Sequence, residues 1–437
     1  MEKETMKPQW NDFISLVKKE VVPALGCTEP ISLALAAATA AHALGAPVER
    51  IDARVSANLM KNGMGVTVPG TATTGLLIAA AAGALGGDPQ GALEVLHYLT
   101  PGQTAAAKRM LEEKRVTLSV ADVPNILYAE AKVYSGSDWA LAAIADTHTN
   151  VIRIERNGRL LLAAEPDTAA DADAESPAPV LSGCRLQDIF DFAIQAPIES
   201  IDFIHDAANL NLSLSNAGIA GSFGLHIGAT MQRQISQGLL PDSLFTQIIL
   251  RTTAASDARM GGATLPAMTN SGSGNQGITA TMPVVVTAEY LKADRETLIR
   301  ALMFSHLTAI YIHSRLPKLS AFCAVTTAAM GAAAGMAWLL KKDFHTASMT
   351  IANMIGDVSG MICDGASNSC AMKVSTSVTS AYKAMLMALE DTRVTASDGI
   401  VEEDIDASIA NLGKLAYNGM RETDREILDI MMKKNCR

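Results

Sequence analysis

The chain switches from one hydrophobic periodicity to another, and an acidic segment separates the two patterns. Apolar and polar residues alternate as in strands between Val116 and Ala163, whereas helical spacing dominates after residue 185. Residues 166–184 are rich in Asp, Ala and Pro, which is typical of a linker. We therefore predict an α+β protein, with a mixed α/β domain at 1–165 and a mostly helical domain at 185–437.

Local patterns predict the elements of the first domain. Amphipathic or Ala-rich stretches predict helices at Asn11–Val22, Ile31–Leu44, Thr73–Leu85 and Gly91–Leu99. Alternating or short apolar stretches predict strands at Ile51–Met60, Val66–Pro69, Val116–Val120, Ile126–Val133, Trp139–Asp146 and Val151–Arg156. The dipeptide Asn157-Gly158 predicts a hairpin turn after the last of these strands.

Composition excludes several classes of function. With 49% hydrophobic residues, the 437-residue chain can bury a large core. Its 35 basic and 45 acidic residues give a net charge of −10, which argues against nucleic-acid binding because that requires a basic surface. The start of the chain lacks the order of a secretory signal, so we expect a cytoplasmic protein. The stretches Thr71–Gly87 and Ala324–Leu340 are Ala- and Gly-rich and too short for membrane spans.

Six cysteines are present, at positions 27, 184, 323, 363, 370 and 436, and none forms a C-x-x-C pair. We do not expect disulfides in a reducing compartment, so clustered cysteines are candidates for metal ligands or nucleophiles. An isolated cysteine such as Cys184 is typical of a small buried apolar residue.

Cys323, Cys363 and Cys370 lie in the helical half, among Ala, Gly and Ser residues. The chain breaker Asp364–Asn368 allows a loop to bring the last two together. Three thiolates can hold a [4Fe–4S] cluster and leave one iron open as a Lewis acid, which suits an elimination reaction. The same positions are compatible with buried structural cysteines, and they lack the close ligand pairs of structural zinc.

Cys27 lies in the segment Gly26–Pro30, directly before an expected helix. Because helix N-termini lower thiol pKa values, a Cys27 thiolate is a candidate base for a Cα proton. Thr28 and Glu29 are candidates for orienting the substrate, and the alternative is that they only cap the helix.

The loop Ser271–Gly277 fits the G-x-G-x-x-G pattern but lacks the preceding hydrophobic strand of a dinucleotide-binding fold. It opens a helix expected near Ile278, whose free N–H groups can bind a carboxylate. A turn without a ligand is the alternative. The candidates for substrate binding are Ser271, Ser273, Asn275 and Gln276.

Two further residues complete the predicted substrate site. Arg259 can clamp a carboxylate, or it can pair with Asp257 as a solvated ion pair. His148 is the second candidate, although a histidine among apolar or small residues is more often a hydrogen-bonded interior residue.

Four stretches of the chain resemble one family: Ala24–Pro30, Asn58–Gly63, Ser271–Gly277 and Gly356–Lys373. They resemble the UPF0597-type L-cysteine desulfidase group, which is similar to the archaeal L-cysteine desulfidases and to the iron–sulfur L-serine dehydratases. The likeness covers nearly the whole chain. It implies that residues 1 to about 165 correspond to the dehydratase β-part and the remainder to its helical α-part.

The same resemblance implies a [4Fe–4S] cluster bound by Cys323, Cys363 and Cys370, with Cys27 as the base. The dehydratases have a Ser-rich motif with a His at the place of Gly26–Pro30, which argues against serine as the preferred substrate. In some dehydratases a C-terminal cysteine reaches the open iron. Cys436 is the corresponding candidate here, and a tail with an incidental thiol is the simpler interpretation.

The expected function is conversion of L-cysteine to pyruvate, ammonia and hydrogen sulfide by cluster-assisted β-elimination. L-serine dehydration at the same site is the nearest alternative. A cluster-free protein that binds a small amino acid is an alternative of another class, and a pyridoxal-phosphate enzyme with Lys373 as its Schiff-base lysine is a third. We expect a small amino acid as the ligand, and a homodimer.

Overall fold

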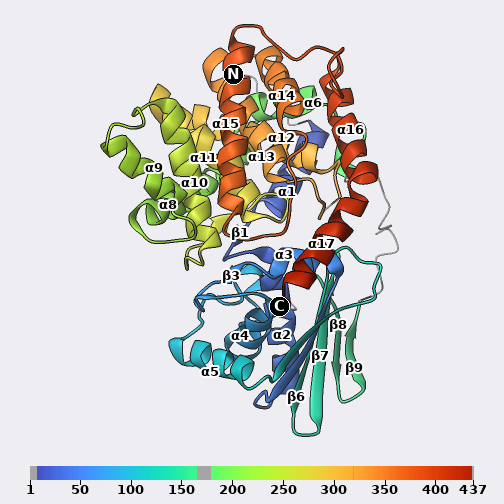
Figure 1. The fold of residues 1–437 in the computed structure, drawn as a ribbon. Coiled ribbons are helices and arrows are strands. Elements are labelled where there is room, and N and C mark those ends of the chain that lie inside the picture. The colour runs from blue at the N-terminus through green and yellow to red at the C-terminus, as the bar shows by residue number, and fades with distance from the viewer. Residues whose placement is uncertain (1–6, 165–178, 318, 436–437) are drawn as a thin grey trace.

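The structure is a computed structural model, and it describes residues 7–164, 179–317 and 319–435. A unit built around a mixed sheet lies against a larger helical unit (Figure 1). The predicted α+β class is therefore confirmed. Of the expected linker, residues 166–178 lie outside the described part, and Pro179–Leu181 forms a short 3-10 helix, η2.

Six strands form the sheet, in the spatial order β5-β2-β6-β7-β8-β9. β2 and β5 run parallel, and the other neighbours are antiparallel. The strands predicted between residues 116 and 156 agree with this sheet to within two residues at each end. The bounds are β2 (Arg50–Val55), β5 (Val116–Val120), β6 (Tyr128–Ser135), β7 (Asp138–Ala145), β8 (Val151–Arg156) and β9 (Arg159–Ala163).

Small residues allow two helices to pack closely beside this sheet. α2 (Thr28–Leu44) contacts β6 and β7, and α4 (Leu76–Gly86) packs on α2. Gly83 permits the close approach, because a Cβ atom there would lie 2.1 Å from the carbonyl oxygen of Ala34. None of the helices in the described ranges is long and apolar enough to cross a membrane.

Two of the strands expected in the N-terminal unit differ in the structure. The strand expected over Ile51–Met60 is shorter than predicted, because its last residues belong to the helix α3 (Ala57–Gly63). The expected strand Val66–Pro69 does not pair back onto it. Instead, β3 (Thr67–Val68) pairs with β4 (Thr73–Thr74).

The helix expected at Gly91–Leu99 is reduced to a 3-10 turn, η1 (Ala92–Glu94), and the helix α5 (Pro101–Glu112) follows it. Hydrophobic periodicity does not predict α5. Its start carries a capping box, in which Thr100 and Gln103 exchange hydrogen bonds. This is a common signal of a helix N-terminus, so the sequence does contain the information that locates α5.

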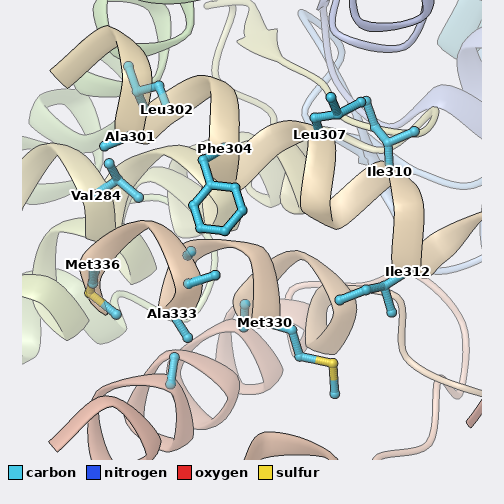
Figure 2. Packing of buried hydrophobic residues seen from close by; sticks show 14 of the residues in the cluster. Val284, Ala301, Leu302, Phe304, Leu307, Ile310, Ile312, Met330, Ala333 and Met336 are labelled. Atoms are coloured by element: carbon cyan, nitrogen blue, oxygen red, sulfur yellow. The ribbon is translucent and has the colours of Figure 1, made fainter. Parts of the chain in front are cut away.

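The second unit is a bundle of helices around a buried apolar core. Figure 2 shows Phe304 of α12 directed toward α13, near Ala333. The helices approach closely because a Cβ atom on Gly331 of α13 would lie 2.3 Å from the carbonyl oxygen of Ser305. The bounds are α6 (Leu186–Gln195), α7 (Ile198–Ile201), η3 (Asp202–Ile204), α8 (His205–Ala220), α9 (Ile227–Ser236), α10 (Leu244–Met260), α11 (Gly274–Leu291), α12 (Arg295–His313), α13 (Val325–Lys341), α14 (Phe344–Val358), α15 (Cys370–Leu389), α16 (Ile405–Lys414) and the π-helical turn η4 (Leu415–Gly419).

The two apolar cores do not divide the sequence at one point. α1 (Pro8–Glu20) packs in the helical unit, where Trp10 and Phe13 make edge contacts with Phe192. At the other end, Leu428 of α17 (Arg421–Asn435) packs against the core of the sheet unit. Each end of the described chain therefore crosses to the unit that is distant from it in sequence (Figure 1).

We expect Gly331→Ala to lower the free energy of unfolding by about 1–3 kcal/mol, because α12 and α13 must separate to admit the methyl group. Gly102→Ala in α5 is the matched control, since a Cβ atom there meets nothing within 4 Å. Urea unfolding of both variants checks the prediction. Equal stability of the two variants would contradict it.

Candidate functional site

A short β pairing brings the predicted motifs together. β1 (Pro23–Ala24) pairs antiparallel with β10 (Ala267–Met268), and the segments that follow these short strands carry Cys27 and the Gly-rich loop. Across 244 positions in the sequence, the Thr28 hydroxyl donates a hydrogen bond to the carbonyl oxygen of Gly272 at 2.8 Å. The Cys27 motif and the Gly-rich loop therefore form one site at the junction of the two units.

Arg259 is buried at the end of α10 and points to the start of α11. A Cβ atom on Gly274, the first residue of α11, would lie 2.2 Å from the Arg259 Nε atom, so only glycine fits there. Within the described residues, Arg259 Nε has no hydrogen-bond partner, and no ion pair joins Arg259 to Asp257. The Asp257 carboxylate instead accepts from the backbone N–H of Gly228 at 2.9 Å.

Three donors converge on one weak acceptor, the thioether sulfur of Met260. The Cys27 thiol lies 3.5 Å from this sulfur, Arg259 Nη1 lies 3.4 Å away and Asn275 Nδ2 lies 3.2 Å away. A thioether satisfies buried donors poorly. The cluster is therefore short of acceptors, which is the property expected of a site that binds an anion.

Cys27 is the N-cap residue of α2, which begins three residues before the predicted Ile31, and it is 2% exposed. Burial raises the pKa of its thiol to about 12, although the charge of Arg259 opposes the shift. The lowered pKa expected from the helix N-terminus is therefore wrong for this structure, because loss of hydration outweighs the helix end.

The carboxylate of Glu29 contacts two polar side chains, one from Thr28, which was predicted, and one from Asn62, which was not. Its carboxylate accepts from Asn62 Nδ2 at 3.3 Å, and the Thr28 hydroxyl lies 3.2 Å from its other oxygen. Asn62 is only 6% exposed, and its Oδ1 atom has no partner among the described residues. Asn62 was recognisable only as part of the motif Asn58–Gly63, because sequence does not show which polar side chains are buried.

His148 joins the site from the loop between β7 and β8. Its backbone oxygen accepts from the Ser32 hydroxyl of α2 at 2.7 Å. Its ring lies against the loop, since a Cβ atom on Gly272 would be 3.1 Å from His148 Cε1. The structure therefore places His148 beside Gly272, which also contacts Thr28.

The four predicted residues of the Gly-rich loop differ in burial and in hydrogen bonding. Gln276 is 3% exposed, and its Oε1 atom has no partner in the described chain. The oxygen of Asn275 already accepts from the Ser256 hydroxyl at 3.0 Å, so this residue holds the loop. Ser273 precedes α11, which begins four residues before the predicted Ile278, and Ser271 lies at the turn of the loop.

Two stretches of the helical unit bring the three predicted cluster cysteines together. Phe322 and Ile362 form an antiparallel β-bridge. Cys323 and Cys363 follow these two residues in opposite directions, so they lie at diagonal positions across the bridge, where Cys323 N donates to the carbonyl oxygen of Met361 and Cys363 N to that of Ala321. Cys370 begins α15 directly after the predicted loop.

The three thiols interact electrostatically with one another. Burial raises the pKa of Cys323 to about 12, and the charges of Cys363 and Cys370 raise it further. Burial likewise raises the pKa of Cys370 to about 11. Cys370 also packs beside Cys27, so the predicted base and the predicted ligands belong to one site. Cys184 is buried elsewhere, as expected, and Cys436 lies outside the described residues.

Comparison with known proteins identifies the family. The family model of the serine dehydratase alpha chain matches residues 90–429. A UPF0597 protein from Chromobacterium violaceum is 66% identical over 425 residues, which cover 97% of this chain and 98% of the relative. The UPF0597 protein YhaM from Salmonella gallinarum is 59% identical over 430 residues (98% of each chain), and a UPF0597 protein from Actinobacillus pleuropneumoniae is 58% identical over 422 (97% of each).

The chain belongs to the UPF0597 group of the serine dehydratase alpha chain family. This confirms the predicted relationship, and it indicates a lyase-type enzyme with a small-molecule substrate.

The donor set consists of three thiols, and thiolates are the usual ligands of iron–sulfur clusters. In a [4Fe–4S] cluster each thiolate binds a different iron, so three thiols would leave the fourth iron open. Structural zinc favours four ligands with close pairs, and this spacing is absent from the three cysteines.

Lys373 does not have the properties of a Schiff-base lysine in this member of the family. Burial alone would lower the pKa of its amine, but the hydrogen bond and charge of Asp364 raise the pKa overall. A lysine that attacks a carbonyl needs a lowered pKa, so the pairing disfavours the pyridoxal-phosphate alternative.

Lys61 links the two units next to the cysteines. Its side chain is fully buried in α3, and its ammonium group donates to the carbonyl oxygens of Ser320 and Cys363, each at 3.5 Å. It also forms an ion pair with Asp424 of α17. Lys61 therefore ties both cysteine-bearing stretches and the last helix to the sheet unit.

We expect Asp424→Ala to lower the free energy of unfolding by about 3 kcal/mol, because it leaves the Lys61 ammonium group buried without a counter-ion. Glu422→Ala on the same helix is the control, since the Glu422 side chain is 82% exposed. Urea unfolding measures both variants. If both lose the same small amount, the buried ion pair contributes little.

His306 supports the Gly-rich loop from beneath. It is fully buried, and its Nδ1 atom lies 3.2 Å from Nδ2 of Asn270, the residue before Ser271. Burial lowers the pKa of His306 to about 3. An unfolded histidine has a pKa of about 6.5, so between these values only the unfolded chain binds this proton. The stability that the neutral ring contributes is therefore lost as the pH falls through this window.

We expect the free energy of unfolding to fall by about 1.4 kcal/mol more in the wild type than in His306→Leu when the pH is lowered from 7.5 to 5.5. The value follows from protonation of the unfolded histidine alone. Urea unfolding of both proteins at the two pH values measures the difference. A pH dependence that is the same in both would show that the folded ring also takes up a proton.

Proposed function

We propose that this chain is an L-cysteine desulfidase, which converts L-cysteine to pyruvate, ammonia and hydrogen sulfide. The observation that carries the proposal is the buried Arg259, which has no carboxylate partner in the described chain and lies beside Cys27. An amino-acid carboxylate supplies the missing acceptor. The N-terminal end of α11 adds free N–H groups and a positive helix end to the same place.

Cys323, Cys363 and Cys370 would hold a [4Fe–4S] cluster. When bound, this cluster would supply a Lewis acid close to the leaving group of the substrate. Cys370 packs beside Cys27, so a substrate bound at Arg259 would be close to both the proton-accepting residue and one of the cluster ligands.

Cys27 accepts the Cα proton in this proposal. Burial keeps its thiol protonated at neutral pH, so the thiol proton must leave before the sulfur can act as a base. The charge of Glu29 opposes the loss of this proton and the charge of Arg259 favours it, and we propose that the proton passes to solvent as the thiolate forms beside Arg259. Loss of hydrosulfide then leaves 2-aminoacrylate, which tautomerises and hydrolyses to pyruvate and ammonia.

The alternatives use the same pocket. L-serine dehydration would release water in place of hydrosulfide, and a cluster-free binding protein would hold an amino acid without turnover. The cytoplasmic location and the homodimer stay predictions.

The test is to purify the protein anaerobically, to measure iron and acid-labile sulfide, and to assay pyruvate and sulfide from L-cysteine and L-serine. We expect about four irons per chain and a higher kcat/KM for L-cysteine. A higher value for L-serine would make the protein a dehydratase. Absence of iron and of turnover after reconstitution would favour the binding protein.

We further expect Cys27→Ala to keep its iron but to lose at least about 100-fold in kcat, because proton transfer contributes this much in general base catalysis. Cys184→Ala is the matched control, because Cys184 is equally buried but distant from the site in the fold. Unchanged turnover in Cys27→Ala would remove Cys27 from the mechanism.

A further inference from the structure

The side chain of Asn270 has only one possible orientation. One of its terminal atoms lies 3.0 Å from the carbonyl oxygen of His306, and a carbonyl oxygen can only accept a hydrogen bond. This atom must therefore be the amide nitrogen, as assigned. The other terminal atom is then the amide oxygen, and it faces the hydroxyl group of Ser271 at 2.9 Å.

The orientation of Asn270 also fixes the proton on His306. The amide nitrogen of Asn270 faces His306 Nδ1, so Nδ1 accepts and the proton of the neutral ring sits on Nε2. Nε2 then donates to the Thr281 hydroxyl at 2.9 Å, which donates in turn to the carbonyl oxygen of Gly277 at 2.7 Å. Asn211 Nδ2 donates to the same hydroxyl at 3.0 Å, so each group of this solvent-free network has one defined role.

The orientation of Asn270 determines in which direction the Ser271 hydroxyl donates its hydrogen bond. Its single proton points at the amide oxygen of Asn270, because that oxygen cannot donate. Only lone pairs of Ser271 Oγ remain for another partner. Ser271 is partly exposed, and its backbone has a φ of +49°, a conformation that a non-glycine residue adopts only where its surroundings hold it.

Ser271 lies where the turn of the loop meets the rest of the site. The next residue, Gly272, accepts from Thr28 and lies against His148, so the turn of the loop meets the Cys27 motif. Arg259 and the end of α11 lie at the other end of the same loop. An amino acid whose carboxylate binds Arg259 carries its ammonium group, which can only donate, on the adjacent carbon.

We propose that Ser271 Oγ accepts a hydrogen bond from the α-ammonium group of the substrate, and that Asn270 and His306 are positioning residues that hold the hydroxyl in this orientation. The inference rests on the proposed function. It makes Ser271 the residue through which the site prefers amino acids to carboxylic acids that lack the amino group.

The test compares L-cysteine with 3-mercaptopropionate, which keeps the carboxylate and the thiol but lacks the ammonium group. For the holoenzyme, KM for L-cysteine and the inhibition constant of 3-mercaptopropionate are measured in the wild type and in Ser271→Ala. We expect KM to rise about 10- to 100-fold, as for a lost hydrogen bond to a charged group, and the inhibition constant to change less than about twofold. A purely structural role of Ser271 would shift both constants alike and would overturn the inference.

Ser271→Gly serves as a second variant if Ser271→Ala does not fold, because glycine accepts the positive φ without strain. Asn270→Ala tests the positioning residue, because it removes the amide oxygen that accepts the Ser271 proton and leaves the backbone carbonyl of His306 in place. We expect KM for L-cysteine to rise in Asn270→Ala and the inhibition constant of 3-mercaptopropionate to change less than about twofold.

The outcomes separate this inference from the proposed function. If the wild type turns over L-cysteine but Ser271→Ala and Ser271→Gly keep its KM, the inference alone is wrong. If the wild type neither turns over nor binds any amino acid, the proposed function is wrong and the inference is wrong with it.

Discussion

The pairing of β1 with β10 is the contact on which the site depends. Each strand has only two residues, yet the segments after them supply Cys27 from the sheet unit and the Gly-rich loop from the helical unit. The hydrogen bond between Thr28 and Gly272 then closes the contact. Because Cys27 comes from one unit and Arg259 from the other, a change in the angle between the units alters the distance between the proposed base and the proposed carboxylate-binding group.

Around the sulfur of Met260 the site holds more donors than acceptors. The Cys27 thiol, Arg259 and Asn275 share the sulfur of Met260, and Arg259 Nε lacks a partner in the described chain. Burial of unpaired donors destabilises a fold, so buried unpaired donors are typical of sites where a ligand supplies the missing acceptors. The opposite holds beneath the loop, where the groups around His306 are mutually satisfied and therefore rigid. A rigid hydrogen-bonded network around His306 next to unpaired donors around Arg259 favours selective binding, because the binding groups are held in place before the ligand arrives.

Sequence predicted the elements that depend on local pattern. The alternation in Val151–Arg156 gave the strand that the structure contains, and the breaker at Asp364–Asn368 gave the loop before Cys370. It failed where the property depends on distant packing. The pKa of Cys27 is set by burial against Met260, 233 positions away, and not by its own helix. Lys61 was missed because only the folded chain shows that its ammonium group is buried.

The ion pair between Lys61 and Asp424 constrains the order in which buried contacts can form while the chain is being made. The two residues are 363 positions apart, so the ribosome makes the lysine long before its counter-ion. A nascent sheet unit that closed around α3 would enclose a lone ammonium group, at a cost of several kcal/mol. The buried contacts of α3 with the cysteine-bearing stretches are therefore completed only once the last helix is available to pair with Lys61.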